Sequence, residues 1–241
     1  MVSGKREIPD NEADLKIRRK KRIKKLFCWL FIDLVVAVIV FALLLHRPGH
    51  YDPTDRDSIG LEDGQVSPYL THELSPQFYN GAQRGEPFDL AITQKGINEI
   101  VAGWGWPRMS EGVMLYAPAV VFVPESVVLM GTANVKGAEF VVTIVLKPSI
   151  DERGLSHLLV AEVKVGAMNV TWPVKMMARK MYAQRLASMP ADTRSFYGKI
   201  AASVLNDEPF EPLFEVDGRK VRIERITVQK QKLTAHLVPT S

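Results

Sequence analysis

A run of twenty apolar residues constrains this chain more than any other feature. Leu26 to Leu45 reads LFCWLFIDLVVAVIVFALLL and holds one charged residue, Asp33. At a rise of about 1.5 Å per residue, a helix of this length matches the hydrocarbon layer of roughly 30 Å. Asp33 costs about 1–3 kcal/mol there, which the aliphatic neighbours offset, whether it is merely tolerated or faces a partner helix. The sequence therefore predicts a transmembrane helix over residues 26–46.

The charges around this run predict its orientation. Eight of the ten residues from Lys16 to Lys25 are basic, and few Lys or Arg follow the run. Positive residues stay in the cytoplasm, so we expect an N-in, C-out anchor, which in a bacterial cell would lie in the inner membrane. A cleaved signal peptide is the alternative, but the run exceeds the usual 7–15 residues and HRPGH has no small-x-small cleavage site. An uncleaved signal-anchor is the favoured interpretation.

The net charge of +4 belongs to the N-terminal tail. Residues 1–25 carry a net charge of +6, whereas the remaining residues carry −2. A folded part near neutrality lacks the clustered Lys and Arg that nucleic acids require, so no nucleic-acid partner is expected. Cys28 is the single cysteine, which leaves no disulfide framework and no cysteine-based metal site.

The order of segments predicts four parts. Residues 1–25 form a basic cytoplasmic tail, 26–46 the span, 47–85 an extracytoplasmic linker and 86–241 an extracytoplasmic domain. The linker is rich in Pro, Asp, Gly and Ser, with a short helix expected over 68–79. The domain opens with a strand in which apolar residues alternate from Phe88 to Ile92, followed by Thr93 as the N-cap of a helix.

Four strand-like runs follow, over 113–123, 126–135, 139–150 and 155–170. Their turn-rich boundaries predict an antiparallel meander. Helices are expected from Pro173 to a break at Met189-Pro190 and over 192–205, and Asp217-Gly218 predicts a closing hairpin. The fold class is therefore α+β: an N-terminal transmembrane helix plus a curved antiparallel sheet packed on a long helix.

The third run is apolar on both faces. Phe140, Val142, Ile144 and Leu146 share one face, while Val141 and Val145 keep the other partly apolar. A strand with two apolar faces is either covered on both sides or lines a cavity.

The helix after Pro173 carries Met176, Met177 and Met181. Methionine is a flexible gap-filler of cores and equally suits adaptable apolar sites, so core packing and ligand lining are both open. Trp104 and Trp106 leave a similar choice between a hydrophobic plug and an aromatic mouth or membrane-interface contact.

Nothing in the sequence indicates catalysis. The five histidines form no metal-ligand spacing, and nucleophile-elbow, P-loop and dinucleotide motifs are absent. We therefore expect neither a catalytic set nor a metal or cofactor.

The order of strand, helix, long meander, two helices and closing hairpin resembles the small bacterial membrane-anchored relatives of the tubular lipid-binding (bactericidal/permeability-increasing-protein-like) superfamily. The resemblance covers about Glu86 to Val238 and rests on the short element Ile92, Thr93, Ile97 and Asn98. It implies a lipid or other long apolar ligand held between helix and sheet. The implied contacts are Phe140, Val142, Ile144, Leu146, Met176, Met177 and Met181.

The expected function is thus non-enzymatic binding or transfer of a membrane lipid or other apolar ligand. The alternative is a structural or interaction module that contacts a protein partner in a cell-envelope assembly.

Overall fold

The structure is a computed structural model that describes residues 11–54, 60, 65–110, 112–188 and 196–240, with side chains described except for 11–23, 181–188 and 196–197. The chain divides into two compact units, Met1–Leu43 and Leu44–Ser241, which are treated separately below.

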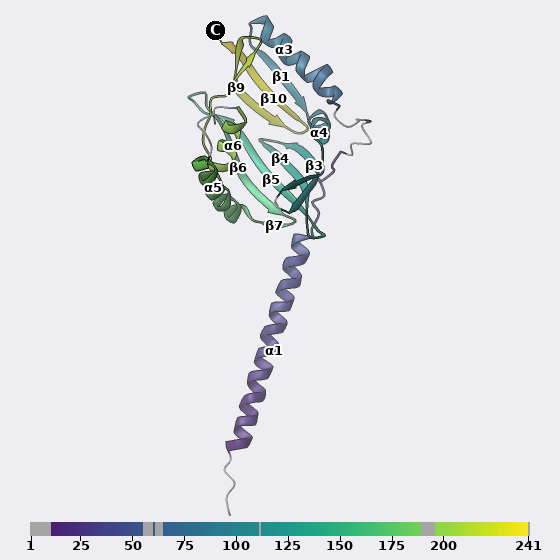
Figure 1. Ribbon diagram of the computed structural model, residues 1–241, viewed down its shortest axis with the longest axis vertical. Helices are drawn as coiled ribbons and strands as arrows, with labels where there is room; N and C mark the ends of the chain where they lie inside the picture. Colours follow the sequence, from purple (N-terminus) through teal and green to yellow (C-terminus); the bar gives the residue numbers. More distant parts are fainter. Residues whose placement is uncertain (1–10, 55–59, 61–64, 111, 189–195, 241) are drawn as a thin grey trace, which may run out of the picture. The chain divides into compact units, whose positions relative to one another are not determined.

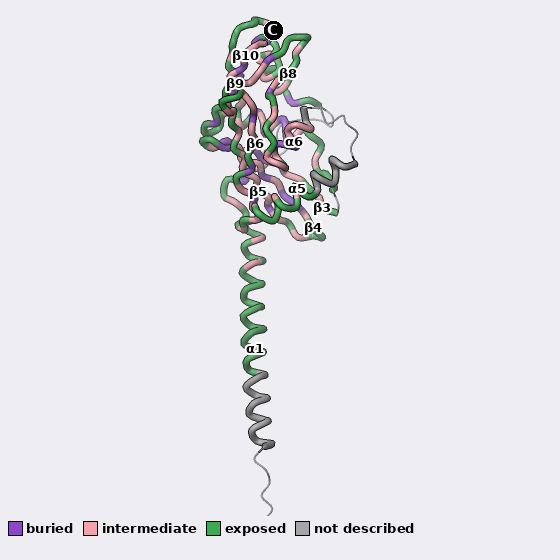
Figure 2. Tube along the Cα trace, turned by 90° about the vertical axis from the view of Figure 1, so that its left-hand side faces the viewer, coloured by how far each residue is buried: buried purple, intermediate pink, exposed green. Residues whose placement is uncertain are grey.

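The first unit is the helix α1, which spans Asn11–Leu44 (Figure 1). Its Lys24–Leu44 segment has 21 residues and is apolar and long enough to cross a membrane. The described side chains of this segment are largely exposed (Figure 2). Such a helix is that of a membrane anchor or of a signal sequence.

The second unit is a mixed α+β domain with two antiparallel sheets. The larger sheet has the order β2-β3-β4-β5-β6-β7 and follows the chain as a meander, as the sequence predicts. The strands are β2 (Arg108–Ser110), β3 (Val113–Val123), β4 (Ser126–Val135), β5 (Ala138–Ile150), β6 (Ser156–Val165) and β7 (Met168–Asn169). The fourth predicted run is shorter than expected, because a turn at Gly166, whose φ is 59°, folds the chain back into β7.

The smaller sheet has the order β1-β10-β9-β8. Its strands are β1 (Phe88–Thr93), β8 (Leu213–Val216), β9 (Arg219–Gln229) and β10 (Lys232–Thr240). The predicted hairpin at Asp217-Gly218 is confirmed, and both residues have positive φ, as a two-residue turn of this kind requires. The single sheet expected from the sequence is wrong, because β1 pairs with β10, some 140 residues later, and not with the meander.

Helix α4 (Gln94–Ala102) begins as predicted, with the Thr93 hydroxyl accepting a hydrogen bond from the Gly96 N–H at 3.1 Å. It lies along β3, which pairs with β2 only over the first residues of β3, Val113–Leu115. The Gln94 side chain accepts from the Phe122 N–H, and Asn98 bonds to Val120. Side chains of the helix therefore satisfy backbone groups that an open sheet edge would expose.

Helices α5 (Thr171–Ser188) and α6 (Phe196–Asn206) pack beside β6, at the other edge of the larger sheet (Figure 1). The hydroxyl of Thr171 accepts from the Val163 N–H at 2.8 Å, and that of Ser203 accepts from the Leu158 N–H at 3.0 Å. The predicted break at Met189-Pro190 lies outside the described residues.

Part of the predicted linker belongs to the domain core. Tyr51 and Tyr69 are buried, and the π-helical turn η1 (Tyr69–Leu74) leads into α3 (Ser75–Arg84), which packs on the smaller sheet. The Tyr51 hydroxyl donates to the Ala117 carbonyl at 2.6 Å and lies 2.7 Å from the Thr132 hydroxyl. The compact unit thus begins at Leu44, well before the expected boundary at residue 86.

A candidate apolar ligand site between the two sheets

One face of the larger sheet, here called the inner face, is lined with apolar residues along two neighbouring strands. Val127, Leu129 and Gly131 of β4 pair with Leu146, Ile144 and Val142 of β5, in that order. Directly paired residues point to the same side of a sheet, so these positions form one continuous strip. The predicted contacts Phe140, Val142, Ile144 and Leu146 all belong to this face and are half-buried.

A cavity of about 350 Å³, here called the sheet cleft, separates the inner face from the smaller sheet. All twelve residues that line it are apolar: Leu90, Ile92, Val127, Leu146, Pro148, Leu158, Phe214, Ile223, Ile226, Leu233, Ala235 and Leu237. A half-open apolar space of this size between two sheets is a candidate ligand site.

A second cavity of about 260 Å³, the Trp106 cavity, lies further along the same face. It is lined by Trp106 and Leu115 together with Leu129, Val142 and Ile144 of the strip. Leu146 and Val127 of the sheet cleft are the next paired positions along β5 and β4. The two cavities therefore occupy consecutive positions on one apolar strip, about 20 Å long from Pro148 to Val142 at roughly 3.3 Å per residue.

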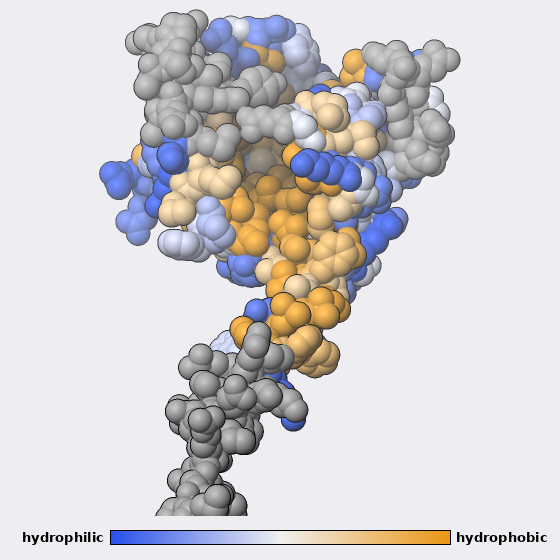
Figure 3. Space-filling view, turned by 60° about the horizontal axis from the view of Figure 1, so that its bottom comes forward, coloured by the Kyte–Doolittle hydropathy of each residue, from blue (hydrophilic) through white to orange (hydrophobic). Residues whose placement is uncertain are grey.

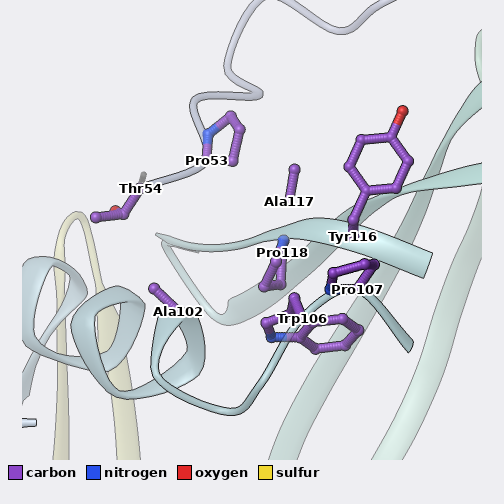
Figure 4. A pocket seen from close by; sticks show the side chains of 8 residues that line it. All are labelled: Pro53, Thr54, Ala102, Trp106, Pro107, Tyr116, Ala117 and Pro118. Carbon is purple, nitrogen blue, oxygen red and sulfur yellow. The ribbon is translucent and has the colours of Figure 1, made fainter. Parts of the chain in front are cut away.

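Trp106 also borders a third cavity of about 300 Å³ between α4, the start of β3 and the segment at Pro53 and Thr54 (Figure 4). The Trp106 indole N–H donates to the Val101 carbonyl at 2.8 Å, and the Arg108 guanidinium lies 5.2 Å from the ring centre. These contacts hold the ring at the junction of the two cavities, where Tyr116 and Pro118 are shared walls. Trp106 is half-buried, and its role as a hydrophobic plug or as an aromatic mouth stays a prediction.

Trp104, the other tryptophan predicted at an interface, is 55% exposed and lines none of these cavities. The fold thus places Trp106, but not Trp104, at the candidate site.

Two tyrosines beside the site have raised pKa values. The Tyr116 phenol hydrogen-bonds the Glu139 carboxylate, which raises the pKa of Tyr116 to about 12 because ionisation would place two negative charges together. Burial raises the pKa of Tyr51, against the opposing effect of its hydrogen bond with Thr132. Both phenols therefore stay neutral to a higher pH than a tyrosine with the ordinary pKa of 10.0.

Met176 and Met177, the methionines of α5 with described side chains, do not line the cavities described here. Met176 and Met177 are 56% and 62% exposed, so these two side chains are not core residues either. The helix turns Thr171, Lys175 and Ala178 toward the domain instead. Met181 lies in α5, but its side chain is outside the described residues. A role of these methionines in ligand binding stays a prediction.

The residues that sequence reasoning missed come from the smaller sheet. Ile223 and Ile226 of β9 and Leu233 and Leu237 of β10 form the wall opposite the strip. In β10 the apolar residues alternate along the sequence, so this part of the wall could have been predicted. In β9 the alternation is broken, because Arg225 pairs with His236 and Ile223 with Leu237, which leaves Glu224 as an extra residue. Because of this bulge, Ile223 and Ile226 both point toward the strip although they are three residues apart. A search for the two-residue period of a strand does not find such a pair.

Polar side chains gather elsewhere. His157 lies 3.2 Å from Asp151 at the β5–β6 turn, and His236 lies 2.7 Å from Asp89 on the smaller sheet. Within the part of the chain that the structure describes, no three His, Cys, Asp or Glu side chains converge as metal ligands would.

Comparison with protein-family models, with curated proteins and with solved structures found no match.

Proposed function

We propose that the domain binds a long apolar molecule, with a lipid acyl chain as the best fit, and that it does so without catalysis. The ligand would lie along the strip from the sheet cleft to the Trp106 cavity. The observation that carries the proposal is the sheet cleft itself, a space of about 350 Å³ with twelve apolar lining residues.

Size and chemistry support an acyl chain. Half of a hydrocarbon layer of about 30 Å is the reach of one layer of lipid tails, roughly 15 Å, and the strip extends about 20 Å. Each methylene removed from water contributes about 0.8 kcal/mol, so a tail that fills the strip is held by apolar burial alone. The residues that would touch it are Val142, Ile144 and Leu146 from the larger sheet.

The same arrangement supports a fold related to the tubular lipid-binding superfamily, whose members hold lipids in an apolar groove. In this chain the proposed groove lies between two sheets. The helix α5 that the resemblance would place over the ligand contacts β6, and its Met176 and Met177 point outward.

Photolabelling tests the proposal on the full chain in liposomes. The probe is a phosphatidylcholine with a diazirine at the end of one acyl chain, and labelled peptides are identified by mass spectrometry. We expect label in the peptides of β5 and β9 as well as in α1. Label in α1 serves as an internal standard for access to the bilayer.

A matched pair of variants makes the test specific. Leu146→Trp fills the sheet cleft, whereas Leu159→Trp adds the same ring to a residue of β6 that is 45% exposed. The first variant should lose most label from β5 and β9 and keep it in α1, and the second should match the wild type. The proposal is wrong if wild-type β5 and β9 stay unlabelled while α1 is labelled.

The outward face of α5 favours a second function, an interaction module in an envelope assembly. Trp172, Met176 and Met177 are large apolar residues left exposed on one helix. A photo-crosslinking amino acid at Met177 should then give one discrete adduct of higher mass in cells, and the same residue at Glu152 should give none. A ladder of many products at both positions would contradict this function.

A further inference from the structure

Exposed apolar side chains gather at one end of the larger sheet. This end, here called the rim end, holds the start of β3, the end of β4 and the start of β5, where Val113, Val135 and Ala138 lie side by side. It also holds β2, which pairs with the start of β3. The chain turns back through β7 beside Val165, and α5 then starts at Thr171, which bonds to Val163 opposite Ile144 in the middle of β5.

Five large apolar residues at the rim end and at the start of α5 are exposed: Trp104, Met109, Leu115, Val135 and Trp172. Met109 is 69% exposed and Trp172 is 75% exposed, which is costly for side chains of this size in water. Figure 3 shows apolar side chains gathered in a hollow on the face of the domain turned toward the viewer. By contrast, the β5–β6 turn at the other end of the sheet holds three charged residues, Asp151, Glu152 and Arg153, followed by Gly154 and Leu155.

The connection to the candidate span reaches the same end. The apolar helix ends at Leu44, and Tyr51 is already fixed between Ala117 and Thr132, on the half of the sheet nearest the rim. Seven residues extend about 25 Å at most, at roughly 3.5 Å each. The half of the sheet that holds Tyr51 is therefore tethered within about 25 Å of the residue at which the apolar helix ends.

The rim and the proposed ligand site share a residue. Leu115 is 37% exposed at the rim end and also lines the Trp106 cavity. Arg108 and Lys136, both exposed, flank it on the neighbouring strand and turn. Tryptophan rings beside basic side chains are the combination that favours the headgroup region of an anionic membrane.

We propose that the rim end lies in the interfacial layer of the same bilayer that holds α1, with Trp104, Met109 and Trp172 immersed among the lipid headgroups. The Trp106 cavity then opens onto lipid, and a tail reaches the sheet cleft past Leu115 without crossing water. This last step rests on the proposed function, whereas immersion of the rim does not.

Fluorescence quenching in proteoliposomes tests the immersion. The full chain carries Cys28→Ser, which removes its only thiol, and one new cysteine labelled with the environment-sensitive dye NBD. Met109→Cys probes the rim end, Trp172→Cys probes the start of α5, and Glu152→Cys is the control at the opposite end. The quencher is a phosphatidylcholine with a doxyl group near the headgroup, in liposomes that contain phosphatidylglycerol.

We expect at least threefold stronger quenching at positions 109 and 172 than at 152. Equal quenching at the three positions overturns the proposal, provided that far-UV circular dichroism matches the wild type; if one rim variant is misfolded, the other decides. The photolabelling experiment separates the two proposals: label in β5 with an unquenched rim disproves only the immersion, and a quenched rim with no label in β5 disproves only the ligand site.

Discussion

The carboxamide of Asn98 pairs with the backbone of Val120 in both directions. Its Nδ2 donates to the Val120 carbonyl and its Oδ1 accepts from the Val120 N–H, each at 2.6 Å. Both residues are buried. Strand β2 pairs only with Val113–Leu115 of β3, so at Val120 the Asn98 amide makes the hydrogen bonds that a neighbouring strand would make. The helix α4 is thus fixed to the sheet by hydrogen bonds as well as by apolar packing.

Replacing Asn98 with Ala should destabilise the domain by about 2–5 kcal/mol, because two buried backbone groups of Val120 lose their partners. Thermal or urea unfolding of the full chain in detergent measures the change. Asn80→Ala, at an exposed position of α3, is the control and should stay within about 0.5 kcal/mol of the wild type. If Asn98→Ala loses no more free energy of unfolding than Asn80→Ala, the prediction is wrong, and water satisfies the backbone groups of Val120 in the variant.

The contact between Gly96 and Tyr69 predicts that Gly96→Ala lowers the free energy of unfolding, whereas the same substitution in an ordinary helix raises it. In an ordinary helix Gly→Ala stabilises by about 0.5–1 kcal/mol, but a Cβ on Gly96 would overlap the Tyr69 ring. Gly96→Ala should therefore cost about 1–3 kcal/mol in the wild type and become neutral or favourable in a Tyr69→Ala background. A double-mutant cycle on unfolding free energies gives the coupling, and additive effects would contradict the overlap.

The Tyr116–Glu139 pair predicts a pH dependence at the edge of the ligand site. The folded pKa of Tyr116 is raised to about 12 from an ordinary value of 10.0, so the pair stabilises the fold below pH 10.0. This contribution is lost as the pH rises from 10.0 to about 12. Glu139→Gln should lower the pKa of Tyr116 toward 10.0, as read from the ¹³Cζ shift of labelled tyrosine assigned with Tyr116→Phe. Glu162→Gln, on β6, should leave that pKa unchanged.

The β5–β6 turn predicts a dependence of the opposite sign. The backbone N–H of Leu155 and then His157 lower the pKa of Asp151 below its ordinary value of 3.8. Its carboxylate therefore stabilises the turn above pH 3.8, and the effect disappears as the pH falls through the lowered pKa. Asp151→Asn should lower Tm near neutral pH, with the difference closing in acid. A Tm difference that stays constant with pH would contradict this prediction, because it would show that the variant loses stability through the geometry of the Asn side chain and not through the loss of charge.

Sequence patterns predict the local structure of this chain well. The meander, the Thr93 N-cap and the Asp217-Gly218 turn depend on neighbouring residues, and the structure confirms each. The inner face of β5 also follows from alternation, which is why Val142, Ile144 and Leu146 could be named as site candidates.

Long-range pairings decide the rest of the fold. The β1–β10 pairing separates a second sheet from the meander and creates the wall opposite the strip. Tyr51 and Tyr69 join the core from a Pro- and Asp-rich segment in which no period marks them. Methionine spacing alone does not say which side of α5 faces the domain, and Met176 and Met177 face away from it.

The β1–β10 pairing has a consequence for biogenesis. Phe88 of β1 meets Leu237 of β10, so the strand made first in the smaller sheet waits for the strand made last. Until residues 232–240 have been synthesised, both β1 and β9 present an unpaired edge. A chain whose synthesis stalls before that point holds a half-closed sheet, the state in which a chaperone or a protease would meet it.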